Sequence, residues 1–162
     1  VSLLLVGLLG VFAVLSQSLG LNRVATDQHI AIQLASEGVE IVKNIIDKDA
    51  RTGNSFAQSI SRTGQVTLDY TTDLLDGYEM EAHSSINPDY LKLDPNTKRY
   101  GYIQGEDTKF IRYVELSRCP DDACVGESQI VRVKSVVEWR ARGGLLGHAE
   151  VEDVFYDWRY SP

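Results

Sequence analysis

The sequence is poor in the residue patterns that most often carry enzyme chemistry. Its 162 residues include three histidines, two cysteines and one methionine. We expect His29 on a helix and His83 and His148 in loops. The HExxH, GxSxG, GxxxxGKS/T and GxGxxG patterns are all absent, so the usual signatures of a zinc protease, a serine hydrolase and two kinds of nucleotide site are missing. We therefore expect a protein that is not an enzyme and that uses no cofactor or metal.

Positive charge is scarce relative to negative charge. The chain has 16 Lys and Arg against 23 Asp and Glu, a net charge of −7. Because phosphate binding needs a clustered positive face, this balance argues against nucleic acid as the main partner. The hydrophobic content of 43% argues against disorder and indicates one domain with a core.

Acidic and aromatic clusters offer weaker alternatives. The acidic stretches "DLLDGYE", "CPDDAC" and "EVED" could bind calcium in principle, but none has the ligand spacing of a calcium loop, which favours solvated acid. The tyrosines Tyr90, Tyr100, Tyr102 and Tyr113 could form an adhesive surface, although cross-strand packing explains most of them.

The two cysteines, Cys119 and Cys124, lie in the stretch "RCPDDAC". A turn between them would allow a disulfide that closes a tight loop, which would place the domain outside the cytoplasm. Two free thiols, or half of a zinc site, are the alternatives. Zinc is disfavoured because it usually takes four ligands and the histidines are far away in the sequence.

The first residues form a long apolar run. No charged residue occurs from Val1 to Asn22, and every residue from Leu3 to Leu15 is apolar or glycine. As a helix, the run would be about 33 Å long, close to the thickness of a bilayer core. Three explanations compete: a cleaved signal peptide, a simple membrane anchor, and a segment that is first held in a membrane and later buried in protein.

A signal peptide fits the run poorly. Such peptides begin with positive charge and end in a small-residue cleavage site, whereas this chain begins apolar and offers only "SQS" near the end of the run. Nothing before Val1 supplies the positive flank that would set a membrane orientation, so we expect that the natural protein begins before Val1.

An amphipathic helix follows the run without a linker. Apolar or small residues recur at spacings of three and four, which predicts one dry helix face. They are Val24, Ala31, Leu34, Ala35, Gly38, Val39, Val42, Ile45 and Ile46. Gly20 alone is too weak a breaker to separate the two parts. We therefore predict one helix from residue 1 to about 49, which ends at "RTGN".

The remainder of the chain predicts antiparallel strands. Alternating residues occur in "QVTLDYT", in the hairpin "YLKLDPNTKRYGYI" with its "DPNT" turn, in "TKFIRYVELSRC", where Arg112 alternates with apolar residues, and in "SQIVRVKSVVEWRARGG". We expect a loop around "DLLDGYEMEAHSSINPD" after the first strand. The loop between Cys119 and Cys124 would join the last two of these strands as the tip of a hairpin. A last strand follows a turn at Gly143 and Gly144 and contains Val151, with Phe155 and Trp158 packing on a neighbour. A helix and a sheet with one dry face each make a two-layer α+β domain. We divide the chain into an apolar helix segment, residues 1–23, and a globular head, residues 24–162.

These stretches together resemble the type IV pilins and their relatives, the minor pilins and the pseudopilins of type II secretion. "SLLLVGLLGVFAVLSQSL" is similar to the pilin polymerisation helix, and "IQLASEGVEIVKNIID" is similar to the "LAQEGIEIVRN" stretch of many bacterial pilins. "TKFIRYVEL", "VRVKSVVEWRARGG" and "FYDWR" look like the sheet of the same subgroup. The likeness covers nearly the whole chain.

One feature departs from the family pattern. Pilins normally begin with a Gly-Phe-Thr-Leu-x-Glu processing site whose glutamate lies five residues into the mature protein, whereas Leu5 stands at that position here. Aligning Gly7 with the usual glycine of the run leaves about seven residues before Val1. We expect the processing site and the glutamate to lie there, rather than a pilin that lacks the acid.

The resemblance implies a filament subunit. It implies a precursor in the cytoplasmic membrane, an extracellular filament on the bacterial surface, and a prepilin peptidase, an assembly ATPase and a platform protein as partners, in adhesion, motility or DNA uptake. When the run leaves the membrane, copies of the same helix are the available cover for its apolar side chains, so we predict a helical homopolymer. The predicted filament-core interface consists of Leu3, Leu4, Leu5, Val6, Leu8, Leu9, Val11, Phe12, Val14 and Leu15.

Two interpretations of the run stay open. Gly7 and Gly10 weaken the helix and form a candidate melting site in the filament, or they merely allow close helix packing. A minor pseudopilin of type II secretion is an alternative to a pilus subunit. The other alternative is a monomeric extracytoplasmic binding domain that uses the run as an anchor.

Overall fold

The computed structural model describes residues 2–52, 63–72, 81–83, 88–118, 130–141, 144 and 146–156. Within these ranges a few side chains are not described, among them those of residues 2–6. The predicted disulfide between Cys119 and Cys124 and the predicted packing of Trp158 lie outside the described residues.

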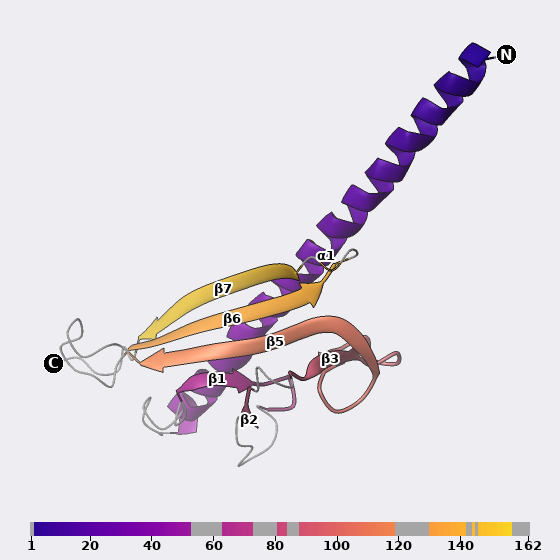
Figure 1. The fold of residues 1–162 in the computed structure, drawn as a ribbon. Helices are drawn as coiled ribbons and strands as arrows, with labels where there is room; N and C mark the ends of the chain where they lie inside the picture. The colour runs from indigo at the N-terminus through magenta and orange to yellow at the C-terminus, as the bar shows by residue number, and fades with distance from the viewer. Residues whose placement is uncertain are drawn as a thin grey trace.

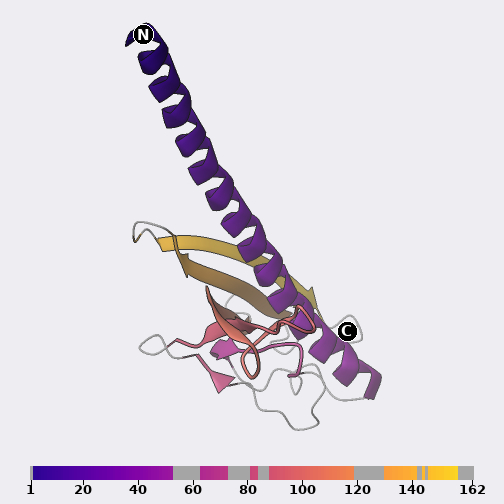
Figure 2. The ribbon, with the colours of Figure 1, turned by 90° about the vertical axis from the view of Figure 1, so that its right-hand side faces the viewer.

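One helix, α1, runs from Ser2 to Thr52 and contains 51 residues. At 1.5 Å per residue it is about 76 Å long. Its C-terminal half lies along the sheet and its N-terminal half projects well beyond it (Figure 1). Figure 2 shows the same projection after a quarter turn. The prediction of a single helix that continues from the apolar run into the amphipathic segment is confirmed.

In the part of the chain that the structure describes, seven strands form one antiparallel sheet. They are β1 (Gly64–Thr67), β2 (Glu81–Ala82), β3 (Tyr90–Leu93), β4 (Tyr100–Gly101), β5 (Glu106–Arg118), β6 (Ile130–Arg140) and β7 (Leu146–Tyr156). β5 lies at the centre of the sheet. One edge of β5 pairs with β6, and the other edge pairs with both β1 and β3. β7 pairs with the far edge of β6. The protein is therefore α+β, with a long helix and an antiparallel sheet, as the sequence predicted.

Most of the predicted strand pairings are present. β3 and β4 form the expected hairpin, and the carboxylate of Asp94 holds its turn by accepting from the backbone N–H of Asn96 and the hydroxyl of Thr97. These hydrogen bonds lower the pKa of Asp94. β2 was not predicted, because it lies in a stretch that the sequence analysis treated as a loop. A strand of two residues is too short to produce a visible alternation.

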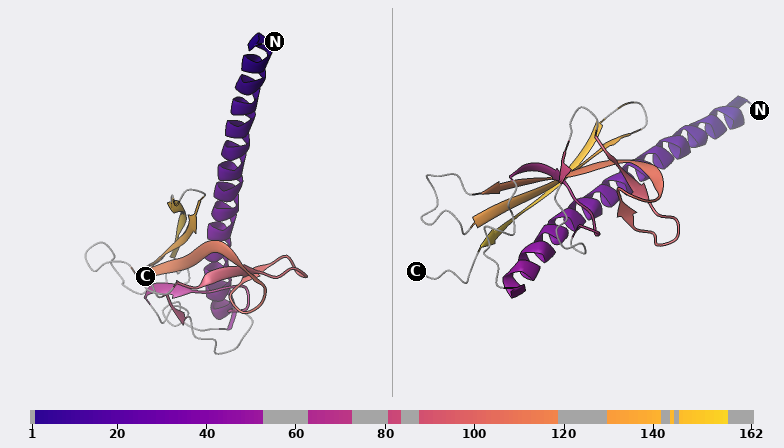
Figure 3. Two further views of the ribbon diagram at one scale, coloured as in Figure 1. Left: turned by 45° about the vertical axis from the view of Figure 1, so that its right-hand side comes forward. Right: turned by 90° about the horizontal axis from the view of Figure 1, so that it is seen from below.

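The core lies between α1 and one face of the sheet. Near the end of the helix, Val39, Val42 and Ile46 pack on a cluster from β1, β5 and β6, and nearer the projecting half, Ala31 and Leu34 pack on a second cluster around Trp139. Figure 3 shows the helix on one side of the sheet in two further views.

One of the predicted core positions is wrong. Val24 is 55% exposed because the sheet does not extend that far along the helix. Val136 is buried, but its neighbour Val137 faces the helix, so Val136 points to the opposite face of the sheet. Ile41, which was not predicted, is buried in the core.

α1 approaches the sheet closely at Gly38. A Cβ atom at this position would stand 2.3 Å from Ser135 Oγ and 3.3 Å from Val114 Cγ2. Gly20, in the same helix, has no such neighbour within 4 Å. Glycine at 38 therefore permits a contact that any side chain would prevent.

Replacing Gly38 by valine should destabilise the head. We expect Gly38→Val to lower the free energy of unfolding by at least about 2 kcal/mol, because overpacking forces α1 away from β6. The matched control is Gly20→Val. It should raise the free energy of unfolding slightly, by less than about 1 kcal/mol, because valine is a better helix former than glycine. Urea unfolding in detergent measures both variants, and equal effects would contradict the prediction.

Candidate functional site

The projecting half of α1 exposes the predicted filament-core residues. The exposed fractions are 55% for Leu8, 67% for Leu9, 57% for Val11, 59% for Phe12, 68% for Val14 and 53% for Leu15. The side chains of Leu3, Leu4, Leu5 and Val6 are outside the described residues. The structure therefore leaves at least six large apolar side chains without cover within the subunit.

These side chains cover about 220° of the helix circumference, and the small apolar residues Gly10 and Ala13 occupy the remainder. Leu8, Leu9, Val11 and Phe12 occupy little more than one turn, and successive residues are 100° apart. A helix that is apolar on all sides is normally buried in a protein core or in a membrane. At 1.5–3 kcal/mol per side chain, covering the six exposed residues would contribute on the order of 10 kcal/mol.

Gly7 and Gly10 lie within the continuous helix. A Cβ atom at either position would meet nothing within 4 Å. The two glycines therefore have no packing role within the subunit. Both of the predicted roles, melting in the filament and close helix packing, involve neighbouring copies.

The histidines are dispersed, and one of them corrects a prediction. His29 lies on α1 beside Gln33, and His83 stacks on Tyr113 with ring centroids 4.5 Å apart. Burial lowers the pKa of His83. His148 was expected in a loop but belongs to β7. In the described part of the chain, no group of three or more His, Cys, Asp or Glu side chains is placed to hold a metal ion.

The described residues also contain no helical stretch that is both long and apolar enough to cross a membrane.

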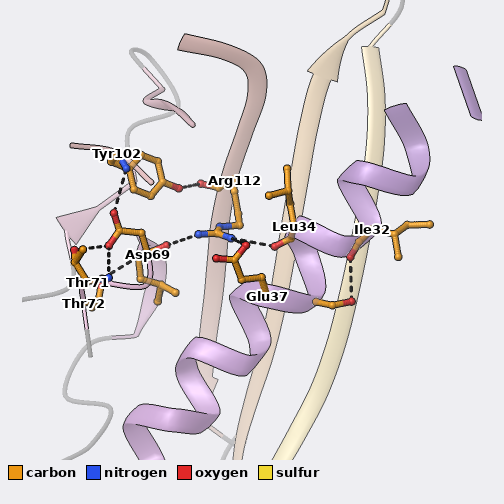
Figure 4. A network of polar contacts seen from close by, with 10 residues as sticks. Ile32, Leu34, Glu37, Asp69, Thr71, Thr72, Tyr102 and Arg112 are labelled. Atoms are coloured by element: carbon orange, nitrogen blue, oxygen red, sulfur yellow. Dashed lines mark hydrogen bonds and ion pairs between the residues drawn. The ribbon is translucent and has the colours of Figure 1, made fainter. Parts of the chain in front are cut away.

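A buried arginine attaches α1 to the sheet (Figure 4). The side chain of Arg112, on β5, is fully buried. Its guanidinium donates to the carbonyl of Leu34 in α1 at 3.1 Å and to the carbonyl of Leu68, just after β1, at 2.9 Å. Glu37 Oε2 lies 3.4 Å from the same group. One side chain thus links the helix, the central strand and the segment after β1.

Tyr102 and Asp69 extend this network. The hydroxyl of Tyr102 donates to the backbone carbonyl of Arg112 at 2.7 Å, and the backbone N–H of Tyr102 donates to Asp69 Oδ2 at 3.1 Å. The other carboxylate oxygen of Asp69 accepts from the backbone N–H and the hydroxyl of Thr71. Asp69 is buried, so these hydrogen bonds compensate its carboxylate for the loss of water.

No protein-family model, curated protein or solved structure matches this chain.

The sequence placed Arg112 correctly but did not reveal its role. It alternates with Phe110, Val114 and Leu116, and all four side chains are buried on the helix-facing side of β5. An arginine at an inward position of an alternating strand is the signal that marks a buried anchor. The carbonyls that it contacts lie 78 and 44 residues away in the sequence, so only the fold identifies them.

The tyrosines and the "EVED" stretch have structural partners. Tyr100 and Tyr102 pack against the cluster around Trp139, which supports the packing interpretation for these two residues. In "EVED", Glu150 pairs with Lys134 at 2.8 Å and Glu152 pairs with Arg132 at 3.2 Å. The stretches "DLLDGYE" and "CPDDAC" lie outside the described residues.

Removing the buried guanidinium should cost far more than removing its partly buried counter-charge. We expect Arg112→Met to lower the free energy of unfolding by about 3 kcal/mol, because two carbonyls lose charged donors. Glu37→Gln should cost less than about 1 kcal/mol, because the Glu37 side chain is 36% exposed and solvent screens the pair. Chemical unfolding compares the two variants, and a larger loss in Glu37→Gln would contradict this assignment.

Tyr102 should make the fold sensitive to alkali. Burial raises the pKa of Tyr102 above its value in the unfolded chain. The protonated Tyr102 side chain therefore contributes its full stabilisation below about pH 10, and this stabilisation is lost as the pH rises through the folded-state pKa. Tyr102→Phe should lose about 1 kcal/mol at neutral pH and show a shallower decline above pH 10.

The matched control for this measurement is Tyr156→Phe. Tyr156 is 63% exposed, so this variant should follow the wild-type pH profile. Some decline should persist in Tyr102→Phe, because burial also raises the pKa of Tyr113. An unchanged slope in Tyr102→Phe would contradict the prediction.

Proposed function

We propose that this protein is a structural subunit that polymerises through the N-terminal half of α1 into a type IV pilus or a related filament. We assign its helix and sheet to the type IV pilin fold on the same basis. The observation that carries the proposal is the group of exposed apolar side chains from Leu8 to Leu15, which surround a helix that continues into the core of the head. Such a helix needs cover that the subunit does not provide.

Other copies of the same chain can provide this cover. Bundled apolar helices would remove these side chains from water and contribute on the order of 10 kcal/mol per subunit before entropy costs. Each copy would bind different surfaces of its neighbours, so the contact does not close and growth gives a helical fibre. The heads then form the outside of the fibre.

The rigid attachment of the helix favours this function over a simple anchor. α1 continues without a break from Ser2 to Thr52, and Arg112 and Gly38 fix its C-terminal half against the sheet. An anchor would work as well on a flexible linker, whereas a helical polymer needs the same stem direction in every copy. A minor pseudopilin would use the same stem in the same way.

The proposal includes a life cycle that the resemblance to pilins implies. The charge-free run from Val1 to Asn22 is held in the cytoplasmic membrane before assembly, with the head outside. A prepilin peptidase, an assembly ATPase and a platform protein process and extract the subunit. The fibre then serves adhesion, motility or DNA uptake, and a disulfide between Cys119 and Cys124 closes a loop of the head.

A charge in the stem should prevent assembly. We expect Leu9→Asp to reduce fibres sheared from cells at least tenfold, because an unpaired carboxylate cannot be buried among apolar helices. Leu146→Asp is the matched control, since it makes the same change at a head position that is 75% exposed, and it should leave the fibres unchanged. The readout is electron microscopy and immunoblotting of the sheared fraction.

Two results would contradict the proposal. The first is a wild-type sheared fraction without fibres that contain this chain. The second is Leu9→Asp fibres in normal amounts. A monomeric anchored domain predicts the first result.

A further inference from the structure

The exposed side of α1 stays uncharged well beyond the apolar stem. Every exposed residue from Val24 to Ser36 lacks a carboxylate, an ammonium group or a guanidinium. These exposed residues are Val24, Ala25, Thr26, Gln28, His29, Ile32 and Gln33. A helix that covers a soluble head normally carries charge on its outer side, yet the first exposed charges after this strip are Glu40 and Lys43.

The two acidic residues in and next to this strip are bound to the head. Asp27 forms an ion pair with Lys109, and Glu37 lies 3.4 Å from the guanidinium of Arg112. Arg23 is the one exposed charge between Gly7 and Ser36 among the side chains that the structure describes. It lies at the junction of stem and strip, and its long side chain allows its charged end to reach the rim of a contact.

Several polar side chains of the strip are already hydrogen-bonded within the helix. The hydroxyl of Thr26 donates to the carbonyl of Asn22 at 2.8 Å, and the Gln33 amide lies 3.0 Å from the His29 ring. At the end of the strip, Ser36 donates to the carbonyl of Ile32 at 3.0 Å. Covering these groups therefore costs less than covering groups that bind only water.

Most of the strip, including His29, Ile32 and Gln33, faces away from the sheet. Val24 and Gln28 instead lie on the same side of the helix as Ala31 and Ala35, where they are exposed. Ala31, Leu34 and Ala35 bury the opposite side of the helix, and Figure 4 shows Ile32 pointing away from Arg112. Ile32 is 43% exposed. From Val24 to Ser36 the strip is about 20 Å long, and the charge-free run before it would be about 33 Å long.

We propose that residues 24–36 form a second part of the filament interface, which packs against the apolar stem of another copy that is displaced along the fibre axis. This inference rests on the proposed function. We infer the occupant from charge. Residues 1–22 are the longest uncharged stretch of the sequence, and packing an uncharged strip against them would leave no buried charge unpaired. The assembly surface thus continues past the boundary at residue 23 that composition suggested.

Charge substitution on the strip tests this proposal in the full chain. Ile32→Asp should reduce sheared fibres about tenfold or more, while the amount of subunit in the cell and its resistance to protease stay normal. Asn44→Asp is the matched control, because it adds the same carboxylate to another exposed position of α1, and it should change the fibre yield less than twofold. Equal yields of the two variants would overturn the proposal.

Photo-crosslinking tests the identity of the occupant. A benzophenone amino acid at position 32 of the full chain should give, in intact wild-type-like fibres, an intermolecular product that mass spectrometry maps to residues 1–22. The same probe at position 44 should give no product with these residues. If the product from position 32 maps to the head of another copy, or if no product forms, the assignment of residues 1–22 as the occupant is wrong.

The two proposals fail differently. Absence of wild-type fibres removes the proposed function, and this inference falls with it. Normal wild-type fibres that require Leu9 but tolerate Ile32→Asp retain the function and remove only the inference.

Discussion

The dry contact between the C-terminal half of α1 and the sheet is the constraint on which the rest of the structure depends. Gly38 brings the helix backbone against Ser135 and Val114, and Arg112 reaches from β5 to a helix carbonyl and to the carbonyl of Leu68. Since buried carbonyls need donors and close packing tolerates no extra atoms, this contact has one geometry. It fixes the direction in which the projecting half leaves the head.

A fixed direction matters because the projecting half is apolar on every side. Such a helix would associate with any apolar surface if it were loosely attached, whereas a helical assembly needs one repeated angle between stem and head. The uncharged strip at residues 24–36 suits the same requirement, because it leaves the back of the helix free of charges that a neighbouring copy could not pair. We interpret the head as both the cover of the proposed fibre and the device that sets its geometry.

Local sequence patterns predicted the helix and most strands. They did not predict how far the sheet extends along the helix or which face of the sheet each buried residue occupies. The helix and the β5–β6 pairing followed from periodicity, because the spacing of apolar residues reports the face of an element directly. Periodicity does not report how far the partner extends, which is why Val24 was placed in the core. It also does not decide which of two adjacent buried valines, Val136 or Val137, faces the helix.

The sequence by itself determined the charge-free stem, the continuous helix, the antiparallel sheet and the α+β class, because each depends on the order of apolar and polar residues along the chain. Only the tertiary structure decided that Arg112 is the anchor, that Gly38 lies close against the sheet and that Asp27 and Glu37 pair with cations of the head. The physical reason is distance: these contacts join residues far apart in the sequence, and the cost of burying a charge depends on partners that only folding brings near.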